Sequence, residues 1–287
     1  MRLPGVSFQS IRGTMQAMRK WYSVVVFLVG CAACARAQWL NYPEARTPRT
    51  KDGKPNLSAP APRTNGPPDL SGVWRAPGET DAEWKQLLGP HGLDLQIDLE
   101  FASRYAVNIL ADFKPGEEPL RHPAAPVQQA ARQEAANPCL PDSVPFTGFI
   151  EPIKIIQTPA ELVVLSEGKG PHRQIYTDGR GLPVDPQPSW MGYSVGKWQG
   201  DTLVVETVGF RDAPLDAFEH PRSESMRITE RFHRRDFGHM DLETTMDDPK
   251  NYTRPFTVKV TLDLIPDSDI QEYICVDNER DRRHMDK

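Results

Sequence analysis

A two-residue period of hydrophobicity runs through the second half of this 287-residue chain and limits its fold more than any other feature. Residues 256–264 show it most clearly, because apolar side chains alternate there with threonine, lysine and aspartate. Short turns separate several of the nine candidate strands: Ile153–Gln157, Glu161–Glu167, His172–Thr177, Tyr193–Trp198, Thr202–Val208, Glu224–Arg234, His239–Met246, Phe256–Leu264 and Ile270–Val276. One covered and one wet face is typical of antiparallel sheets. We therefore expect a mainly β fold, an antiparallel meander forming a barrel or barrel-like sheet, with a two-sheet sandwich as the alternative.

The last long hairpin predicts its own register. If Asp236-Phe237-Gly238 is a three-residue loop with Gly238 in the left-handed conformation, Arg235 lies opposite His239. The same register pairs two sets of apolar residues and three sets of opposite charges: Phe232 with Leu242, Ile228 with Met246, Arg227 with Asp247, Arg231 with Glu243 and His233 with Asp241. Apolar and charged pairs fall on opposite faces, as cross-strand pairing requires.

This register turns Glu230 toward the interior, on the face of Phe232 and Leu242 and opposite Thr244. A carboxylate in apolar surroundings is a candidate general acid or base, or a partner for a cationic ligand. The alternative is structural: an inward arginine or a backbone amide satisfies the carboxylate.

A long loop, residues 177–190, is punctuated by prolines and predicts a ligand-contact region over one barrel end. Together with Glu230, the candidate ligand-binding residues are Arg173, Tyr176, Asp178, Arg180, Trp190 and Tyr193. The alternative is that the loop only packs across that end.

No metal site or cofactor is expected. The histidines and carboxylates of residues 220–241 lack metal-ligand spacing, and the register places His233 and His239 on the polar outer face. Nucleotide-binding, phosphate-loop and nucleophile-elbow motifs are absent from the sequence.

Residues 1–37 read as an export signal. Arg19 and Lys20 precede an apolar run at residues 21–30, and Ala35-Arg36-Ala37 is a small-x-small cleavage site. The run is too short for a transmembrane segment. We expect a secreted or periplasmic protein; in the alternative, Leu28–Cys31 is a lipobox and Cys31 carries a lipid anchor to the bacterial envelope.

Processing would change both charge and cysteine content. Residues 1–37 contain five basic and no acidic residues, so the remainder carries 29 basic against 39 acidic residues, a net charge of −10. Such a field repels phosphate backbones, and no nucleic-acid partner is expected. Cleavage after Ala37 leaves Cys139 and Cys275, which predict one disulfide in an oxidising compartment; two buried free thiols are the alternative.

The segment before the strands divides into two parts. Residues 38–70 are rich in proline and predict an extended arm, in which Pro48–Ser58 is echoed by Pro62–Ser71. Residues 71–287 are expected to form a single β-rich domain with a helical insert at residues 80–136. The candidate helices are a capping-box segment starting at Thr80, then Leu99–Phe113 and Pro126–Ala136.

Several stretches resemble a family of secreted proteins without an assigned function, found mainly in soil bacteria of the acidobacterial type. They are Asp69–Trp74, Tyr176–Arg180, Gly192–Thr207 (GYSVGKWQGDTLVVET), Thr229–Phe232 and Asp236–His239. The resemblance covers nearly the whole processed chain and implies export, but no activity. Gly72-x-Trp74 before a strand meander is also similar to lipocalin-like barrels, which implies a ligand-carrying role by fold analogy, although the helical insert departs from that pattern.

Three functions remain open from the sequence. The first is a small-molecule-binding barrel. The second is a metal-independent acid–base enzyme on the same scaffold that uses Glu230. The third is a cell-envelope interaction protein whose arm docks to a partner. Neither the ligand nor the oligomeric state is specified by these patterns.

Overall fold

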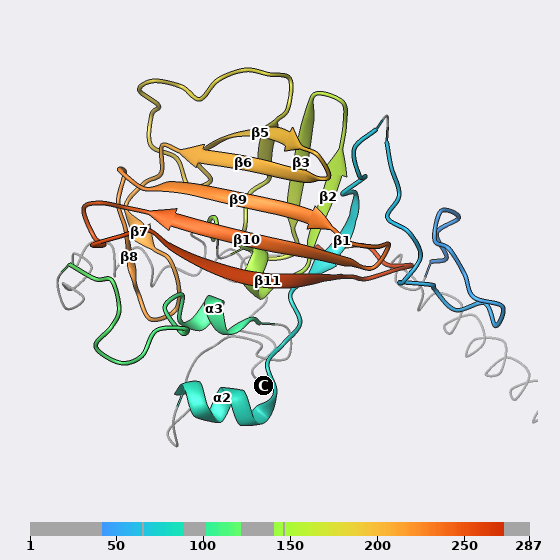
Figure 1. Ribbon diagram of the computed structural model, residues 1–287, viewed down its shortest axis with the longest axis horizontal. Coiled ribbons are helices and arrows are strands. Elements are labelled where there is room, and N and C mark those ends of the chain that lie inside the picture. The colour runs from blue at the N-terminus through green and yellow to red at the C-terminus, as the bar shows by residue number, and fades with distance from the viewer. Residues whose placement is uncertain (1–41, 65, 89–101, 122–140, 146, 273–287) are drawn as a thin grey trace, which may run out of the picture. The chain divides into compact units, whose positions relative to one another are not determined.

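A closed β-barrel dominates the computed structural model, which describes residues 42–64, 66–88, 102–121, 141–145 and 147–272 (Figure 1). Its strands are β1 (Gly72–Arg75), β2 (Ile153–Gln157), β3 (Glu161–Ser166), β4 (Arg173–Tyr176), β5 (Tyr193–Gln199), β6 (Thr202–Val208), β9 (Arg227–Arg234), β10 (His239–Asp247) and β11 (Phe256–Leu264). Their order around the barrel is β1-β11-β10-β9-β6-β5-β4-β3-β2, and β1 closes it by pairing with both β11 and β2. The barrel prediction is confirmed, and the fold is not a two-sheet sandwich.

The strand order departs from a pure antiparallel meander at one point. β4 and β5 pair in parallel, through Ile175 with Ser194 and Tyr176 with Val195. The connection between them, which includes the long proline-rich loop, therefore carries the chain back to the barrel end where β4 began. Residues between β6 and β9 form a separate two-stranded ribbon, β7 (Ala213–Pro214) with β8 (Pro221–Arg222).

The predicted register of the β9–β10 hairpin is confirmed at all five residue pairs. The loop conformation is different, because Gly238 is not in the left-handed region. The Asp236 carboxylate forms the turn instead, accepting hydrogen bonds from the backbone N–H groups of Gly238 (3.0 Å) and His239 (2.8 Å).

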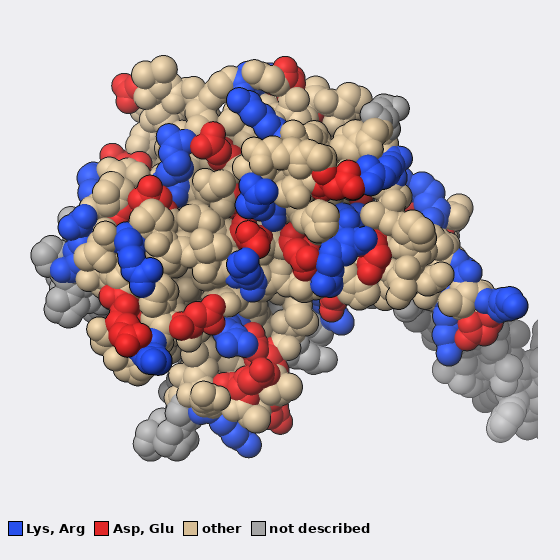
Figure 2. Space-filling model, viewed as in Figure 1, with Lys and Arg blue, Asp and Glu red and all other residues tan. Residues whose placement is uncertain are grey.

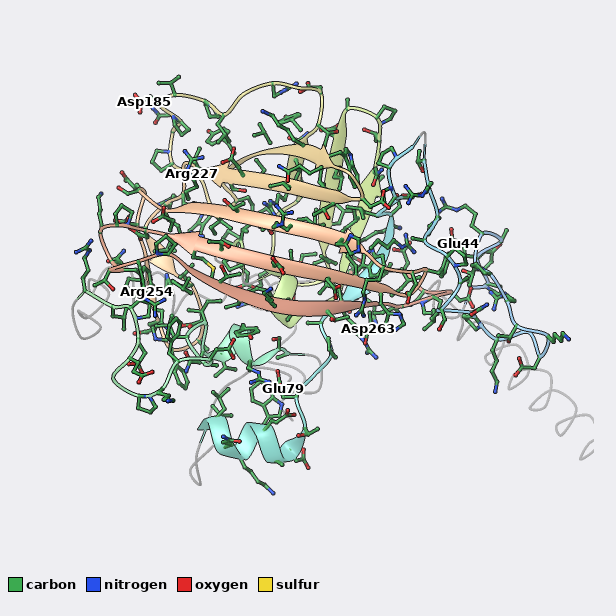
Figure 3. The ribbon with its side chains drawn as sticks, in the orientation of Figure 1. Glu44, Glu79, Asp185, Arg227, Arg254 and Asp263 are labelled. Atoms are coloured by element: carbon green, nitrogen blue, oxygen red, sulfur yellow. The ribbon has the colours of Figure 1, made fainter. Side chains whose placement is uncertain are left out.

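The outer barrel face carries interspersed charges of both signs (Figure 2). The ion pairs on this face are not the residue pairs that lie directly opposite each other in the β9–β10 hairpin. They are Arg227 with Glu206, Arg235 with Asp241 and Lys259 with Glu243. Figure 3 shows Arg227 on β9 and Asp263 on β11, two strands whose outer faces contribute to this polar surface. Each strand has two neighbours, and the charges pair across both.

In the described part of residues 80–136, two helices are present. The capping-box helix exists as α2 (Asp81–Leu88), with the Thr80 N–H donating to Glu83 Oε2 at 2.8 Å. The expected helix Leu99–Phe113 is wrong: within its described part only α3 (Arg104–Val107) is helical. The Ile109 N–H donates to the Asp216 carboxylate rather than to a helical carbonyl, so tertiary contacts replace the helix there. A further turn, α5 (Thr147–Ile150), was not predicted.

Two other expected elements lie partly or wholly beyond the described ranges. Pro126–Ala136 lies outside them altogether. Of the expected strand Ile270–Val276, residues 270–272 are described and are not in a strand. In the described part of the chain, no helix is long and apolar enough to cross a membrane.

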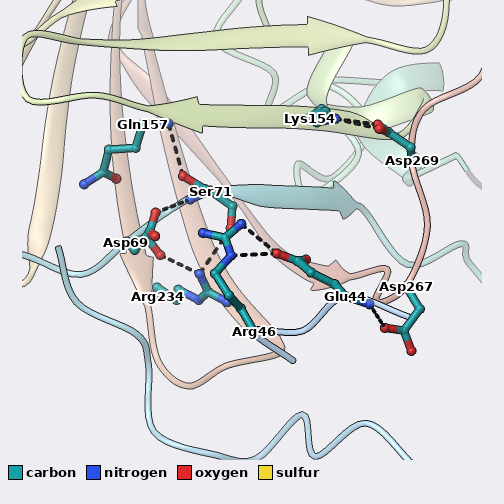
Figure 4. Close-up of polar contacts among 9 residues, drawn as sticks. All are labelled: Glu44, Arg46, Asp69, Ser71, Lys154, Gln157, Arg234, Asp267 and Asp269. Atoms are coloured by element: carbon teal, nitrogen blue, oxygen red, sulfur yellow. Dashed lines mark hydrogen bonds and ion pairs between the residues drawn. The ribbon is translucent and has the colours of Figure 1, made fainter. Parts of the chain in front are cut away.

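The described arm residues after Tyr42 lie against the barrel (Figure 4). Arg234 joins the two, because its guanidinium donates to the carbonyl oxygens of Asp69 in the arm and Phe237 in the β9–β10 loop. The backbone N–H of Gly238 donates to the Leu57 carbonyl at 2.7 Å. A Cβ on Gly238 would come within 2.5 Å of the Leu57 Cβ, so glycine here permits close approach of the arm.

The two echoed arm segments adopt the same local structure. Isolated β-bridges join Arg49 to Pro55 in the first and Arg63 to Pro68 in the second. Each arginine then forms an ion pair with a barrel loop: Arg49 with Asp267 at 2.6 Å, and Arg63 with Asp201 at 2.5 Å. The repeat therefore provides two equivalent attachment points.

Candidate functional site

A buried ion pair joins two barrel strands that are not neighbours, β4 and β9, which are separated by β5 and β6. Arg173 on β4 donates to Glu230 on β9 through Nη1 to Oε1 (3.1 Å) and Nη2 to Oε2. Their side chains are only 6% and 4% exposed. Strand alternation accounts for the direction of Arg173, since its in-facing neighbour Ile175 is fully buried and Gln174 is exposed. The structural alternative for Glu230, an inward arginine, is the one observed.

Two hydroxyls complete the polar cluster. Arg173 Nε donates to Ser194 Oγ at 3.2 Å, and Nη2 also donates to Thr207 Oγ1 at 2.9 Å. Directly across from Glu230, the Thr244 hydroxyl is fully buried and has no hydrogen-bond partner among the described residues. The cluster thus unites β4, β5, β6 and β9, and leaves one polar group beside it unsatisfied.

The ion pair lines a small cavity. Its volume is about 20 Å³, and it is lined by Val144, Pro145, Gly148, Ile153, Val164, Ser166, Pro171, Arg173, Met191, Glu230, Phe232 and Leu242. A space of this size holds about one water molecule. The lining is apolar apart from Ser166 and the ion pair. The barrel interior here is therefore mostly side chains, with room for one water-sized group next to two charges.

Residues 142–145, which we call the cover segment, contribute Val144 and Pro145 to the cavity wall. Arg222 holds this segment: its Nη1 donates to Ser143 Oγ at 2.6 Å and to the Val144 carbonyl at 3.0 Å. Arg222 is itself fully buried, with its guanidinium 4.7 Å from the centroid of the Phe210 ring. Burial lowers the pKa of Arg222 to about 10, which still leaves it charged near neutral pH.

Glu151 is a functional candidate that the sequence patterns missed. Burial and the nearby Asp142 raise the pKa of its carboxyl to about 7, with Lys169 acting in the opposite direction. Glu151 Oε2 lies 3.5 Å from the hydroxyl of Ser166, which lines the cavity. The carboxylate also lies against Gly168, where an added Cβ would overlap it. No periodic pattern includes Glu151, so only its tertiary surroundings identify it.

The remaining sequence candidates do not join this cluster. Tyr176, Asp178 and Arg180 form their own group, with the Arg180 guanidinium 3.7 Å from the Tyr176 ring centroid and hydrogen-bonded to the Asp178 carboxylate. Trp190 lies 5.2 Å from the guanidinium of Arg211. Tyr193 is in the β4–β5 parallel region and is 38% exposed. Of the predicted ligand residues, only Arg173 and Glu230 thus line the cavity, while Tyr176, Asp178 and Arg180 form a separate group.

The proline-rich loop itself extends outward. Figure 3 shows Asp185 on this loop, away from the strands that carry Arg227 and Asp263. Val184 beside it is fully exposed.

Histidines and acids form pairs rather than clusters. His220 Nδ1 lies 2.5 Å from Asp216 Oδ2, and His239 Nδ1 lies 2.7 Å from Asp236 Oδ1. Across the described ranges, no three His, Cys, Asp or Glu residues are grouped so that they could hold a metal ion. The cysteines Cys31, Cys139 and Cys275 lie outside those ranges, and with them the predicted lipid anchor and disulfide.

Searches against known proteins give no match to any family model or to any curated protein. The acidobacterial and lipocalin-like resemblances are therefore still expectations. Function has to be argued from the buried cluster and its cavity.

Proposed function

We propose that this protein is a small-molecule-binding barrel whose ligand inserts a polar group beside Arg173 and Glu230. The observation that carries the proposal is that the ion pair lines a cavity and does not lie in a fully packed core. Burying two charges is costly, and apolar residues of similar size often stabilise a fold equally well or better. A buried pair next to open space therefore favours a role in binding.

The cavity limits how the ligand binds. A volume of about 20 Å³ accepts only the polar end of a molecule. The rest of the ligand must displace side chains near the cavity. Met191 is suited to this, because a methionine side chain is unbranched and adapts its shape at low cost. The neighbouring apolar lining then accommodates the ligand body.

A fragment screen followed by amide chemical-shift mapping tests this function. We expect hits to shift the backbone signals of Val144, Ser166 and Met191. Val164→Phe, which fills the cavity, should remove these shifts, whereas Val204→Phe on the outward side of β6 should leave them. Hits that map only to other surfaces would refute binding at this site.

Export through residues 1–37 is part of the same proposal, with the protein acting in the periplasm or outside the cell. It is supported by the basic, apolar and small-x-small succession of that segment. The N-terminal sequence of protein purified from its own cells tests it. Gln38 at the N-terminus supports simple cleavage, a blocked Cys31 supports the lipid anchor, and an intact N-terminus overturns export.

A metal-independent acid–base enzyme is a second candidate, favoured by one observation. Glu151 has a pKa of about 7 and contacts Ser166 at the cavity, as a residue that exchanges protons near neutral pH would. Glu230, the residue expected from the sequence, is a weaker choice because Arg173 engages both its oxygens. Glu151→Gln distinguishes the two candidates: an enzyme would lose turnover of a bound ligand while keeping its affinity.

The described part of the arm supports no third candidate. Arg49 and Arg63 form ion pairs with the barrel part of the same chain, and Gly238 N–H donates to the Leu57 carbonyl. Other polar contacts of the arm, such as Arg46 with Glu44, lie within the arm itself. We therefore propose no docking partner for it.

A further inference from the structure

The cluster around Glu230 has no net charge. Its single guanidinium and single carboxylate neutralise each other at hydrogen-bond distance. Any ion that enters a site of low polarity without a counterion pays a large desolvation cost. An ionic ligand would find no uncompensated counter-charge there unless Arg173 and Glu230 separated, and separation would leave one of them buried and uncompensated.

The ion pair retains both a hydrogen-bond donor and hydrogen-bond acceptors that have no partner within the cluster. Arg173 has five N–H groups, and four of them are accounted for by Ser194, Thr207 and the two oxygens of Glu230. One Nη1 hydrogen has no acceptor among the described residues. Each carboxylate oxygen of Glu230 accepts one of these bonds and keeps a lone pair.

Thr244 is an independent indication of an absent polar partner. Its side chain is fully buried, its hydroxyl has no partner in the described part of the chain, and it faces Glu230 across the β9–β10 pair. Buried hydroxyls without a partner are uncommon and call for a bound water or ligand group. One donor, carboxylate lone pairs and a free hydroxyl therefore occur together in the same part of the interior.

We infer that the ligand is an uncharged molecule whose head group both donates and accepts hydrogen bonds, such as an amide or a hydroxyl, on a short apolar body. The head accepts from Arg173 and donates to Glu230 without disturbing the ion pair. The body contacts the apolar lining, which includes Val164, Phe232 and Leu242. This inference rests on the proposed binding function and specifies its ligand class.

Four probes of equal chain length test the ligand class: butanamide, 1-butanol, butanoate and butylammonium. Each is titrated into the full chain at pH 7.5 while the amide signals of Ser166 and Met191 are followed. We expect butanamide or butanol to bind at least about tenfold more tightly than either ion, a difference equivalent to about 1.4 kcal/mol. Thr244→Val should weaken the neutral probes severalfold, whereas Thr245→Val, on the outer face of the same strand, should not.

The outcomes separate the ligand class from the function. Tighter binding of butanoate or butylammonium at the cavity overturns the neutral class and leaves the binding function standing. Equal affinities of all four probes also overturn it, because charge would then make no difference. No cavity shift with any probe, in a protein whose fragment hits map to the cavity, again overturns only the class. If neither the probes nor the fragments shift the amide signals of the cavity residues, the binding function is overturned as well.

Discussion

Arg173 and Glu230 determine each other's role, because neither has another charged partner among the hydrogen bonds and ion pairs described for them. Each is nearly inaccessible to solvent, so removing one charge leaves the other without compensation in an apolar interior. The net contribution of the ion pair to the free energy of unfolding is therefore much smaller than the destabilisation caused by removing either charge alone.

Glu230→Gln should lower the free energy of unfolding by about 3–5 kcal/mol, as expected when a buried ion pair loses one partner. The double variant Arg173→Met, Glu230→Leu should recover most of that loss. The matched control is Glu206→Gln, since Glu206 pairs with Arg227 on the outer face and both side chains are 48% exposed; its effect should stay below about 1 kcal/mol. Denaturant unfolding at pH 7 measures all three. Equal losses of unfolding free energy in Glu230→Gln and Glu206→Gln would contradict the claim that burial makes the Arg173–Glu230 pair sensitive to loss of one charge.

Glu151 predicts a pH dependence of unusual sign. Its pKa is raised from 4.5 to about 7 in the folded protein, so between those values the folded state binds a proton that the unfolded state has released. This contribution to stability is therefore present at low pH and is lost as pH rises from about 4.5 to about 7.

Comparison of the unfolding free energy of wild type and Glu151→Gln between pH 4.5 and pH 8 isolates the pH-dependent contribution of the Glu151 carboxyl to stability. We expect wild type to lose about 1–2 kcal/mol relative to the variant, a figure reduced for the partial exposure of Glu151. Glu243→Gln on the outer face serves as control. A constant difference between wild type and Glu151→Gln over this range would show that the pKa of Glu151 is not raised.

At the scale of elements, the arm is part of the fold. Both echoed segments end in a Leu-Ser pair: Leu57 packs against the core and Leu70 is fully buried in it. The close approach at Gly238 is the contact most sensitive to substitution, because it leaves no space for a Cβ.

Gly238→Ala should loosen the arm and lower the free energy of unfolding by about 1–3 kcal/mol through the clash with Leu57. Trypsin should then cleave sooner after Arg49 and Arg63. Gly181→Ala is the control, since no atom lies within 4 Å of a Cβ added there, and its effect should stay within about 0.5 kcal/mol. Unchanged proteolysis of Gly238→Ala would mean that the arm does not depend on this contact.

The sequence predicted those elements whose pairing is local. The β9–β10 hairpin followed from alternation and opposing side chains, because its two strands adjoin in the chain. The parallel pairing of β4 with β5 and the loss of helix after Val107 depend on distant contacts, and no local pattern encodes them. The register also gave the inward direction of Glu230.

The partner of Glu230 could not be read in the same way. Arg173 lies two strands away around the barrel from β6, the neighbour of β9, and the sequence indicated it only as a residue near the long loop. Glu151 follows a turn and precedes a proline, where apolar alternation carries no information. Both assignments require the closed barrel.

At the scale of the whole molecule, β1 is the strand that closes the barrel. It precedes most of the sheet in sequence, yet it pairs with the last strand, β11, and with β2. Trp74 at its centre is fully buried, and its indole N–H donates to the Leu70 carbonyl at 2.9 Å. The strand therefore couples the arm to the C-terminal hairpins.

Trp74→Ala should lower the free energy of unfolding by about 3–5 kcal/mol and speed amide hydrogen exchange in β11 and β2 together. Simultaneous loss of protection in both strands follows from closure by β1. Val184→Ala, at a fully exposed loop position, should change neither quantity. Faster exchange in β2 alone would indicate that the β1–β11 pairing does not hold the barrel closed.

The central claim is that the barrel holds a small molecule beside Arg173 and Glu230. Native mass spectrometry of the protein purified from its own cells tests it most directly, with Val164→Phe purified in parallel. We predict a bound species on the wild-type protein that dissociates as an uncharged molecule on gentle activation and is missing from the variant. The same bound mass on both proteins, or none on either, would contradict the claim.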